Sequence, residues 1–481
     1  MTTMKKILAM LLALVMLLSL AACATPDSGS DSTTAPGGDS DSTTAPATGP
    51  KRKITVGVHW DFHYDSADSS LTDDPAYAGL EADQMRFDVV KYIEDTFNVE
   101  IEFIDLTWDG VRESLNTSVL AGTPECDLYL VDAAAGVPAV SNGLVLDLKE
   151  VLPADADVLS DHKIMNYLDI GDGKACLMYA VKAENTVADT YPLAFNKQLL
   201  DSENLEDPRE LYARGEWTWD KFIEYATKLT KDTNGDGVVD QWGFDSFVDD
   251  YLPALLMSNG ANIAGGTKQA LDSPETIEAL QFLGDIYNKY KIAAPYDFEA
   301  DLHWDTHRYS YRNGNVAFWT SAAWMTGTDY DPDGTVGTTL PFDTIYVQWP
   351  VGPSGDQATN GGKLTGGGSA SYFVIPKGVE DPELVYKVFE AWNNWYMGDT
   401  TIRDDPETMN WWYVCTAKEE GLQMENFNVM YDLGSRESYD LYPALGLDWW
   451  LGDIVVGNMT AAQFAETHRQ QVQDKLDSLF G

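Results

Sequence analysis

The chain has 481 residues, of which 44% are hydrophobic and 12% aromatic, and its formal net charge at pH 7 is −46. That length allows about three domains or two large lobes, and the composition argues against pure disorder, collagen and multi-span membrane architectures. Such an acidic surface repels phosphate backbones, anionic headgroups and polyanionic solutes, so no nucleic-acid partner is expected. The 15 tryptophans are a large number, and secreted proteins rich in tryptophan often stack some of them on ligands.

The first residues have the pattern of a bacterial export signal. Two lysines precede an apolar run from Ile7 to Leu20, which is shorter than the about 20 residues that a transmembrane helix needs. The run ends in Leu-Ala-Ala-Cys23, which resembles the lipobox of bacterial lipoproteins, whose cysteine is lipidated and becomes the new N-terminus. We therefore predict a signal peptide over residues 1–22 and a lipid anchor at Cys23 as the sole membrane attachment. Ordinary secretory cleavage after Ala22 is the alternative.

A polar, low-complexity segment follows the cysteine. Residues 24–50 consist mainly of Ser, Thr, Asp, Pro, Gly and Ala, and the sequence Asp-Ser-Thr-Thr-Ala-Pro occurs at 31–36 and again at 41–46. Such a segment cannot bury enough apolar surface to fold. Residues 23–52 are therefore predicted to be a lipid anchor and disordered linker that holds the folded part off the membrane.

Three cysteines remain if Cys23 is lipidated. They are Cys126, Cys176 and Cys415, so at most one disulfide can form within the chain. No Cys-x-x-Cys spacing is present, so the sequence supports neither a thiol-redox motif nor a structural zinc cluster.

Strand and helix patterns alternate at the start of the folded part. Alternating apolar residues or short apolar runs predict strands at 53–58, 99–106 and 127–131, and helical spacing predicts helices at 81–97 and 108–120. This β-α-β-α-β order indicates an α/β fold with a parallel sheet covered by helices. Helical patterns dominate later in the chain, for example at 219–230, 273–290 and 460–480.

Polar and aromatic side chains follow two of the predicted parallel strands. His59, Trp60 and Asp61 come directly after the first strand, and Asp132 follows the third. In open α/β sheets, ligands bind beyond the carboxyl ends of the strands. These four residues are therefore candidates for a ligand site.

Seven segments, in chain order, resemble motifs of one family, the extracytoplasmic solute-binding proteins of ABC importers, in particular the carbohydrate-binding group related to maltose-binding protein. They include Ala-Gly-Thr-Pro-Glu-Cys-Asp127, Phe-Asn-Lys197, Trp-Thr-Trp-Asp220 and Arg-Asn-Gly-Asn-Val-Ala-Phe318. The others are at 142–148, 271–280 and 366–376.

The resemblance implies a two-lobed periplasmic-binding-protein-like fold with a hinge between the lobes. The N-lobe would comprise 54–190 plus 320–366, and the C-lobe 191–319 plus 367–481. The chain would be a monomeric binding protein, not an enzyme, that captures a sugar or oligosaccharide at the outer face of the cell membrane and delivers it to an ABC permease. A binding protein for a peptide or another solute is the alternative, followed by a secreted carbohydrate-active enzyme, such as a glycosidase with paired carboxylates.

Sugar sites combine aromatic rings, which stack on the apolar faces of the sugar, with polar groups that bind its hydroxyls. On this basis the strand-end residues and the family pattern give the following predicted ligand-binding set: His59, Trp60, Asp61, Asp132, Trp304, Trp319, Trp324, Gly367 and Trp412. Trp219, at the start of a predicted helix, is assigned to packing instead.

A short acidic loop resembles an EF-hand calcium loop. The predicted metal ligands are Asp232, Asn234, Asp236, Val238 through its carbonyl, Asp240 and Gln241. Gly237 lies at the position where such a loop turns sharply, but Gly243 replaces the glutamate that normally closes it. We expect a structural Ca²⁺ of low to moderate affinity there and no catalytic cofactor. A turn without metal is the alternative.

Overall fold

The computed structural model describes residues 49–59, 81–170, 173–181, 187, 190–296, 310–320, 340, 342–358, 360, 363–365, 371–404, 420–447 and 451–480. All of them belong to one unit that spans Pro46–Gly481. None of the helices within these ranges is both long enough and apolar enough to cross a membrane.

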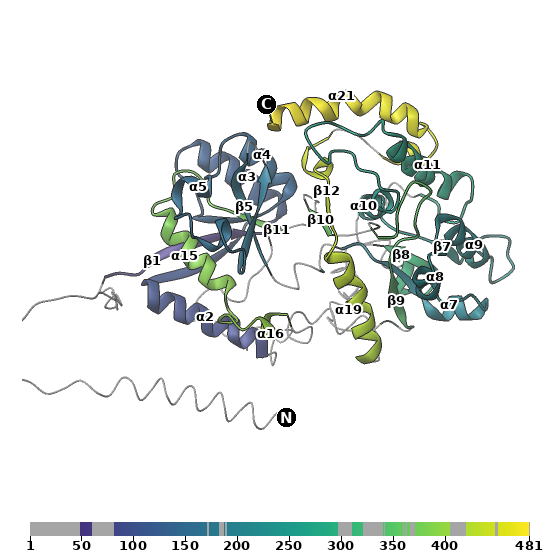
Figure 1. Ribbon diagram of the computed structural model, residues 1–481, viewed down its shortest axis with the longest axis horizontal. Coiled ribbons are helices and arrows are strands. Elements are labelled where there is room, and N and C mark those ends of the chain that lie inside the picture. Colours follow the sequence, from purple (N-terminus) through teal and green to yellow (C-terminus); the bar gives the residue numbers. More distant parts are fainter. Residues whose placement is uncertain are drawn as a thin grey trace, which may run out of the picture. The chain divides into compact units, whose positions relative to one another are not determined.

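A six-stranded mixed sheet organises the first part of the chain (Figure 1). Its strands, in spatial order, are β2 (Val99–Asp105), β1 (Arg52–Val58), β3 (Leu128–Asp132), β11 (Ser371–Val374), β5 (Lys174–Ala180) and β4 (Met165–Ile170). β1 pairs in parallel with β2 and β3, whereas β11 runs antiparallel to β3 and β5. β4 and β5 form an antiparallel pair.

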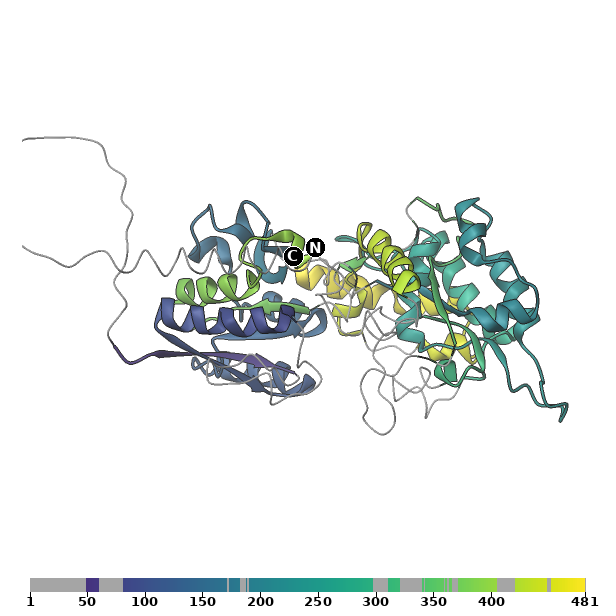
Figure 2. The ribbon, with the colours of Figure 1, turned by 90° about the horizontal axis from the view of Figure 1, so that it is seen from below.

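The predicted β-α-β-α-β order at the start of this sheet is confirmed. Helix α2 (Glu81–Phe97) connects β1 to β2, and α3 (Trp108–Leu120) connects β2 to β3. Helix α15 (Pro382–Asn393) lies beside α2, as Figure 2 shows, and apolar residues of both helices share a core with β1, β2 and β3. The other short helices of this part are α4 (Ala133–Ser141), α5 (Leu148–Val151), η2 (Asp157–Leu159) and α16 (Thr400–Arg403).

A second sheet of four strands organises the middle of the chain. Its order is β7 (Trp242–Phe244), β8 (Val316–Thr320), β6 (Leu193–Asn196) and β9 (Thr344–Val347). The helices of this part and of the C-terminal part are α7 (Lys197–Ser202), α8 (Pro208–Ala213), α9 (Trp219–Leu229), α10 (Val248–Ser258), α11 (Pro274–Asn288), α19 (Glu420–Gly434), η3 (Tyr442–Ala444), α20 (Gly452–Val455) and α21 (Ala461–Phe480).

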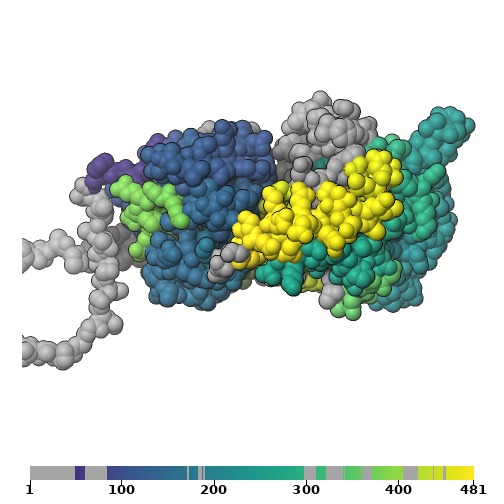
Figure 3. All heavy atoms as spheres, turned by 90° about the horizontal axis from the view of Figure 1, so that it is seen from above, coloured from purple at the N-terminus to yellow at the C-terminus, as the bar shows by residue number. Residues whose placement is uncertain are grey.

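The helices predicted in the second half are confirmed, and their caps explain where they begin. The Ser273 side chain accepts a hydrogen bond from the Thr276 amide, and Pro274 stands at the first helical position of α11. Thr460 and Gln463 form a reciprocal capping box at the start of α21. Helix α21 packs on α11 and α4 and lies on the face of the molecule seen in Figure 3.

The strand pairings correct the predicted lobe boundaries at two places. β9 lies in the segment 320–366 that was assigned to the N-lobe, yet it pairs with β6 in the second sheet. β11 lies in the segment 367–481 that was assigned to the C-lobe, yet it pairs with β3 and β5 in the first sheet. Both strands are four-residue, mostly buried apolar runs. A local pattern of that kind fits either sheet, because the pairing partner is chosen by long-range contacts.

A two-stranded parallel sheet joins two other distant segments. β10 (Lys363–Thr365) pairs with β12 (Glu437–Tyr439). In sequence, β10 stands between β9 of the second sheet and β11 of the first sheet. The chain therefore passes from the second sheet to the first through β10, and β12 is the strand that pairs with it.

Candidate functional site

The carboxyl ends of the three parallel strands form one edge of the first sheet. Val58 at the end of β1 is in register with Asp105 at the end of β2, and the Leu106 amide donates to the Val58 carbonyl. Asp132 ends the neighbouring strand β3. The predicted placement of His59 and Asp132 at this edge is therefore confirmed.

His59 lies against an exposed tryptophan. Its imidazole meets the Trp108 indole edge-on, with ring centroids 4.3 Å apart and an interplanar angle of 71°. Burial lowers the pKa of His59 to about 4, against the opposing effects of a hydrogen bond with the Leu130 backbone and of the Asp105 carboxylate. The imidazole is therefore neutral at physiological pH and acts as an aromatic surface, not as a cation.

Trp108 stands directly after a strained residue. Thr107 has φ 63° and ψ 167°, a region that non-glycine residues rarely occupy. Its hydroxyl accepts a hydrogen bond from the Gly110 amide, and its own amide donates to Asp105 Oδ1 at 3.0 Å. These contacts hold Thr107 in place and so set the direction in which α3 begins. The Trp108 side chain remains 48% exposed.

Asp132 joins two elements at the same edge. It is buried, and its Oδ1 accepts a 2.6 Å hydrogen bond from the Ala135 amide, which caps α4. Its other oxygen, Oδ2, lies 4.0 Å from Nη2 of Arg112 on α3. Burial raises the pKa of Asp132, although the Ala135 amide and the Arg112 guanidinium oppose the shift.

Other predicted ligand-binding residues fall into two groups. Trp319 lies in β8, where it is 2% exposed and stacks on Tyr311 with centroids 5.5 Å apart, so its placement favours a packing role. The remaining predicted residues lie outside the described part of the chain: Trp60, Asp61, Trp304, Trp324, Gly367 and Trp412. The packing role assigned to Trp219 is confirmed, because its ring stacks on Phe282 at 4.1 Å and an angle of 3°.

Sequence reasoning missed Trp108 and Arg112. Both lie in the segment 108–120, which was predicted only as a helix. Its apolar spacing does not show which face of the first turn is exposed. One signal was present: a large aromatic residue stands three positions after the end of a strand, at the edge where ligands bind.

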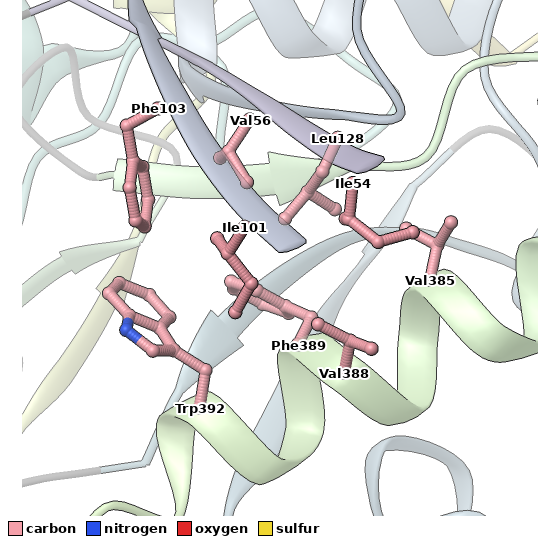
Figure 4. A pocket seen from close by; sticks show the side chains of 9 residues that line it. All are labelled: Ile54, Val56, Ile101, Phe103, Leu128, Val385, Val388, Phe389 and Trp392. Carbon is pink, nitrogen blue, oxygen red and sulfur yellow. The ribbon is translucent and has the colours of Figure 1, made fainter. Parts of the chain in front are cut away.

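A small cavity lies elsewhere, between the first sheet and α15. Figure 4 shows the nine side chains that line it, all of them apolar apart from the indole nitrogen of Trp392. Its volume of about 10 Å³ is at the lower limit for one water molecule. It is a packing defect of the core and too small for any solute.

The acidic loop has a turn structure built by its own side chains. Asp232 accepts hydrogen bonds from the amides of Gly235 and Gly237, at 2.6 and 2.7 Å. Both glycines have positive φ, 81° and 89°. Asn234 and Asp236 each accept from the amide two residues further on, at 2.9 and 2.8 Å.

The side-chain oxygens of this loop suit calcium in chemistry, but those of Asp232, Asn234 and Asp236 accept hydrogen bonds from the backbone of the loop itself. Asp240 accepts hydrogen bonds from the amide and hydroxyl of Thr233, which lower its pKa, and Gln241 donates its side-chain amide to the Leu229 carbonyl. Among the residues that the structure describes, no three His, Cys, Asp or Glu side chains are grouped as a metal site. The calcium prediction therefore stays a prediction.

Two of the three remaining cysteines are described. Cys126 and Cys176 are both buried and free. Burial is the main cause that raises the pKa of each thiol to about 12. Neither thiol is therefore a ready nucleophile or metal ligand.

The two sheets, each flanked by helices and linked by the segment that contains β10, define a two-lobed periplasmic-binding-protein-like fold. A family model described as bacterial extracellular solute-binding protein matches residues 78–394, which is more than half of the chain. The chain belongs to this family.

Solved structures share the fold at low sequence identity. An ABC substrate-binding protein from Listeria monocytogenes, in complex with cycloalternan, is 15% identical with a TM-score of 0.57, covering 90% of this chain and 100% of its own. The cyclic alpha-maltosyl-1,6-maltose binding protein from Arthrobacter globiformis is 17% identical with a TM-score of 0.57, covering 89% and 99%. The maltose/maltodextrin-binding domain MalE from Bdellovibrio bacteriovorus, bound to maltotriose, is 13% identical with a TM-score of 0.55, covering 88% and 98%.

Proposed function

We propose that this protein captures a sugar or oligosaccharide outside the cell and delivers it to the permease of an ABC importer. The observation that carries the proposal is the half-exposed Trp108, one helical turn from Arg112, whose guanidinium group faces Asp132 at the edge of the sheet where ligands of open α/β folds bind. An aromatic face next to a hydrogen-bond donor and an acceptor is what a sugar ring requires. Several proteins that share the fold were solved with oligosaccharides, which agrees with this ligand class.

The anchoring of the protein is part of the same proposal. Export through the signal peptide of residues 1–22 and lipidation of Cys23 would keep the binding protein at the outer face of the membrane, near its permease. The acidic linker would let the folded part, as a monomer, move between the solution and the transporter. Mass spectrometry of the N-terminal peptide from the native membrane fraction tests this part, because a chain that starts with an unmodified residue 23 contradicts it.

A structural Ca²⁺ in the loop of residues 232–241 is also proposed. The support is the chemistry of the donors, since aspartate, asparagine and carbonyl oxygens are the ligands that calcium prefers. The ion would stabilise a loop and take no part in binding the sugar.

The function is tested by thermal unfolding of the chain carrying Cys23→Ser against neutral oligosaccharides, peptides and small polar solutes. A ligand at about 100 times its dissociation constant adds roughly 2.7 kcal/mol to the free energy of unfolding, which raises the midpoint by several degrees at most. A shift with a glycan that mass spectrometry finds intact afterwards supports the proposal. A shift with peptides alone contradicts the ligand class, and hydrolysis of the glycan contradicts a pure binding role.

A further inference from the structure

Trp108 and Arg112 form one continuous surface on the first turns of α3. They are four residues apart in a helix, so their side chains lie on the same face one turn apart. Trp108 is 48% exposed, and the Arg112 side chain is 46% exposed. An indole ring and a guanidinium group are therefore presented together to the solvent at the carboxyl edge of the sheet.

The indole is held before any ligand arrives. His59 contacts it edge-on from the end of β1, and the constrained backbone of Thr107 precedes it. A side chain that is already ordered loses little conformational entropy on binding, so its contact with a ligand contributes more to the affinity.

The gap between Arg112 and Asp132 has the right length for a bridging group. The 4.0 Å between Nη2 and Oδ2 is too long for a direct hydrogen bond. Arginine only donates hydrogen bonds and an ionised carboxylate only accepts them, whereas a hydroxyl group does both. A hydroxyl can therefore accept from Arg112 and donate to Asp132. The Ala135 amide, bonded to Oδ1, holds the carboxylate in the orientation that this requires.

We propose that Trp108, Arg112 and Asp132 form a subsite for one ring of a neutral pyranose sugar. The indole stacks on the apolar face of the ring, and the Arg112–Asp132 pair binds a ring hydroxyl. The ligand is neutral because Asp132 balances the charge of Arg112, and the net charge of −46 repels an acidic sugar. This inference rests on the proposed function and adds to it a subsite and a charge class.

The subsite is tested by calorimetric titration of the chain carrying Cys23→Ser with maltotriose, cellotriose, mannotriose, xylotriose and trigalacturonic acid. For the neutral sugar that binds most tightly, Trp108→Ala should raise the dissociation constant at least about tenfold. Trp108→Phe should keep most of the affinity that Trp108→Ala loses, because phenylalanine also offers an aromatic face. Asp132→Asn should weaken binding about as much while the thermal midpoint is kept, because asparagine also caps a helix.

Two matched controls accompany these variants. Tyr92→Ala removes a 51% exposed aromatic residue from α2, and Asp381→Asn changes the aspartate that caps α15. Neither should change the dissociation constant by more than about twofold, because neither side chain belongs to the proposed subsite.

The outcomes separate the subsite from the function. If the unsubstituted chain binds a neutral sugar and Trp108→Ala binds it equally well, the subsite is wrong and the function stands. Tighter binding of trigalacturonic acid than of every neutral sugar overturns the charge class. If none of the five oligosaccharides binds, both the subsite and the proposed function are overturned.

Discussion

Oδ2 of Asp440 accepts a 2.7 Å hydrogen bond from the backbone amide of Ile263, a residue 177 positions earlier in the chain. Its Oδ1 accepts two more, from the amides of Ala264 and Tyr442 at 2.8 and 3.1 Å. Asp440 directly follows β12, the strand that pairs with β10 between the two sheets in the chain. A buried carboxylate thus fixes the end of this strand to the loop before α11.

The titration of Asp440 should make the stability of the protein depend on pH. Burial raises the pKa of Asp440 to about 6, against the three backbone amides that favour the ionised form. The folded protein then binds this proton more tightly than the unfolded chain does. The resulting contribution of Asp440 to the free energy of unfolding is therefore fully present below about pH 4 and is lost as the pH rises through 6. Its size is at most about 3 kcal/mol, since one pKa unit corresponds to about 1.4 kcal/mol.

The measurement is the difference in free energy of unfolding between the unsubstituted chain and Asp440→Asn, followed from pH 4 to pH 7. The side chain of the variant does not titrate, so all other groups cancel in the difference. The unsubstituted chain should lose stability relative to the variant as the pH rises. A difference that is constant over this range would show that Asp440 keeps an ordinary pKa.

A close backbone contact leaves no room for a side chain at Gly243 in β7. A Cβ atom at this position would meet the Ala226 carbonyl oxygen at 2.2 Å, and neither backbone can move away without disturbing the packing of α9 on β7. Gly243→Ala should therefore lower the free energy of unfolding by about 2–4 kcal/mol in denaturant titrations. Gly421→Ala in α19 is the matched control. Its Cβ would meet nothing within 4 Å, and alanine should leave stability unchanged or raise it by up to about 1 kcal/mol.

Trp219 should stabilise the fold far more than Trp108 does, although both begin a helix. Trp219 is 5% exposed, stacks on Phe282 and donates from its indole nitrogen to Ser258 Oγ at 3.1 Å. Trp219→Ala should lower the free energy of unfolding by about 3–5 kcal/mol. Trp108→Ala should change it by less than about 1 kcal/mol, because nearly half of its side chain is already in water. Equal losses would mean that Trp108 is a packing residue.

Calcium should raise the thermal midpoint of the protein if the acidic loop binds it. The expected effect is a midpoint that rises by a few degrees between excess chelator and millimolar CaCl₂, because an ion that binds the folded state alone stabilises it. Asp236→Ala should abolish the response, since it removes a central donor. Asp474→Ala removes a carboxylate of α21 and should leave the response intact. An equal response in both variants would place the calcium effect elsewhere.

The elements of the fold were predictable because their patterns are local. The alternation of strands and helices from residue 53 to 131 and the positions of α11 and α21 depend on neighbouring residues, and the structure has them as predicted. The partner sheets of β9 and β11 were not predictable. Each is a short apolar run, and its partner depends on residues more than a hundred positions away.

The candidate site was predictable in its place but not in its membership. The carboxyl edge of the parallel strands follows from the β-α-β order alone, and His59 and Asp132 were found by that rule. To predict Trp108 as a member of the site, one must know which face of α3 is exposed. Trp319 was selected from a family pattern, but it is buried against Tyr311. The residue type alone does not tell whether a tryptophan in a strand packs in the core or contacts a ligand.

Thr107 offers a test of whether strain at the site is connected with binding. Its positive φ costs a non-glycine residue about 1–3 kcal/mol, and glycine avoids this strain. Thr218, the cap of α9, is a matched control. It accepts its capping hydrogen bond at the same 3.4 Å and has almost the same ψ, 166°, but its φ is −120°. Thr218→Gly should therefore lower the free energy of unfolding by up to about 1 kcal/mol.

Thr107→Gly should instead leave the free energy of unfolding unchanged or raise it by about 1 kcal/mol, because the relief of strain offsets the weaker cap and the greater freedom of the unfolded chain. The same variant should weaken sugar binding several-fold, since a glycine before Trp108 no longer holds the indole in one direction. Denaturant titration of both threonine variants measures the change in stability, and calorimetric titration with the sugar measures the change in affinity. A loss of stability in Thr107→Gly equal to that in Thr218→Gly would mean that the backbone of Thr107 stores no strain. Unaltered sugar affinity in Thr107→Gly would mean that this backbone does not orient Trp108 for binding.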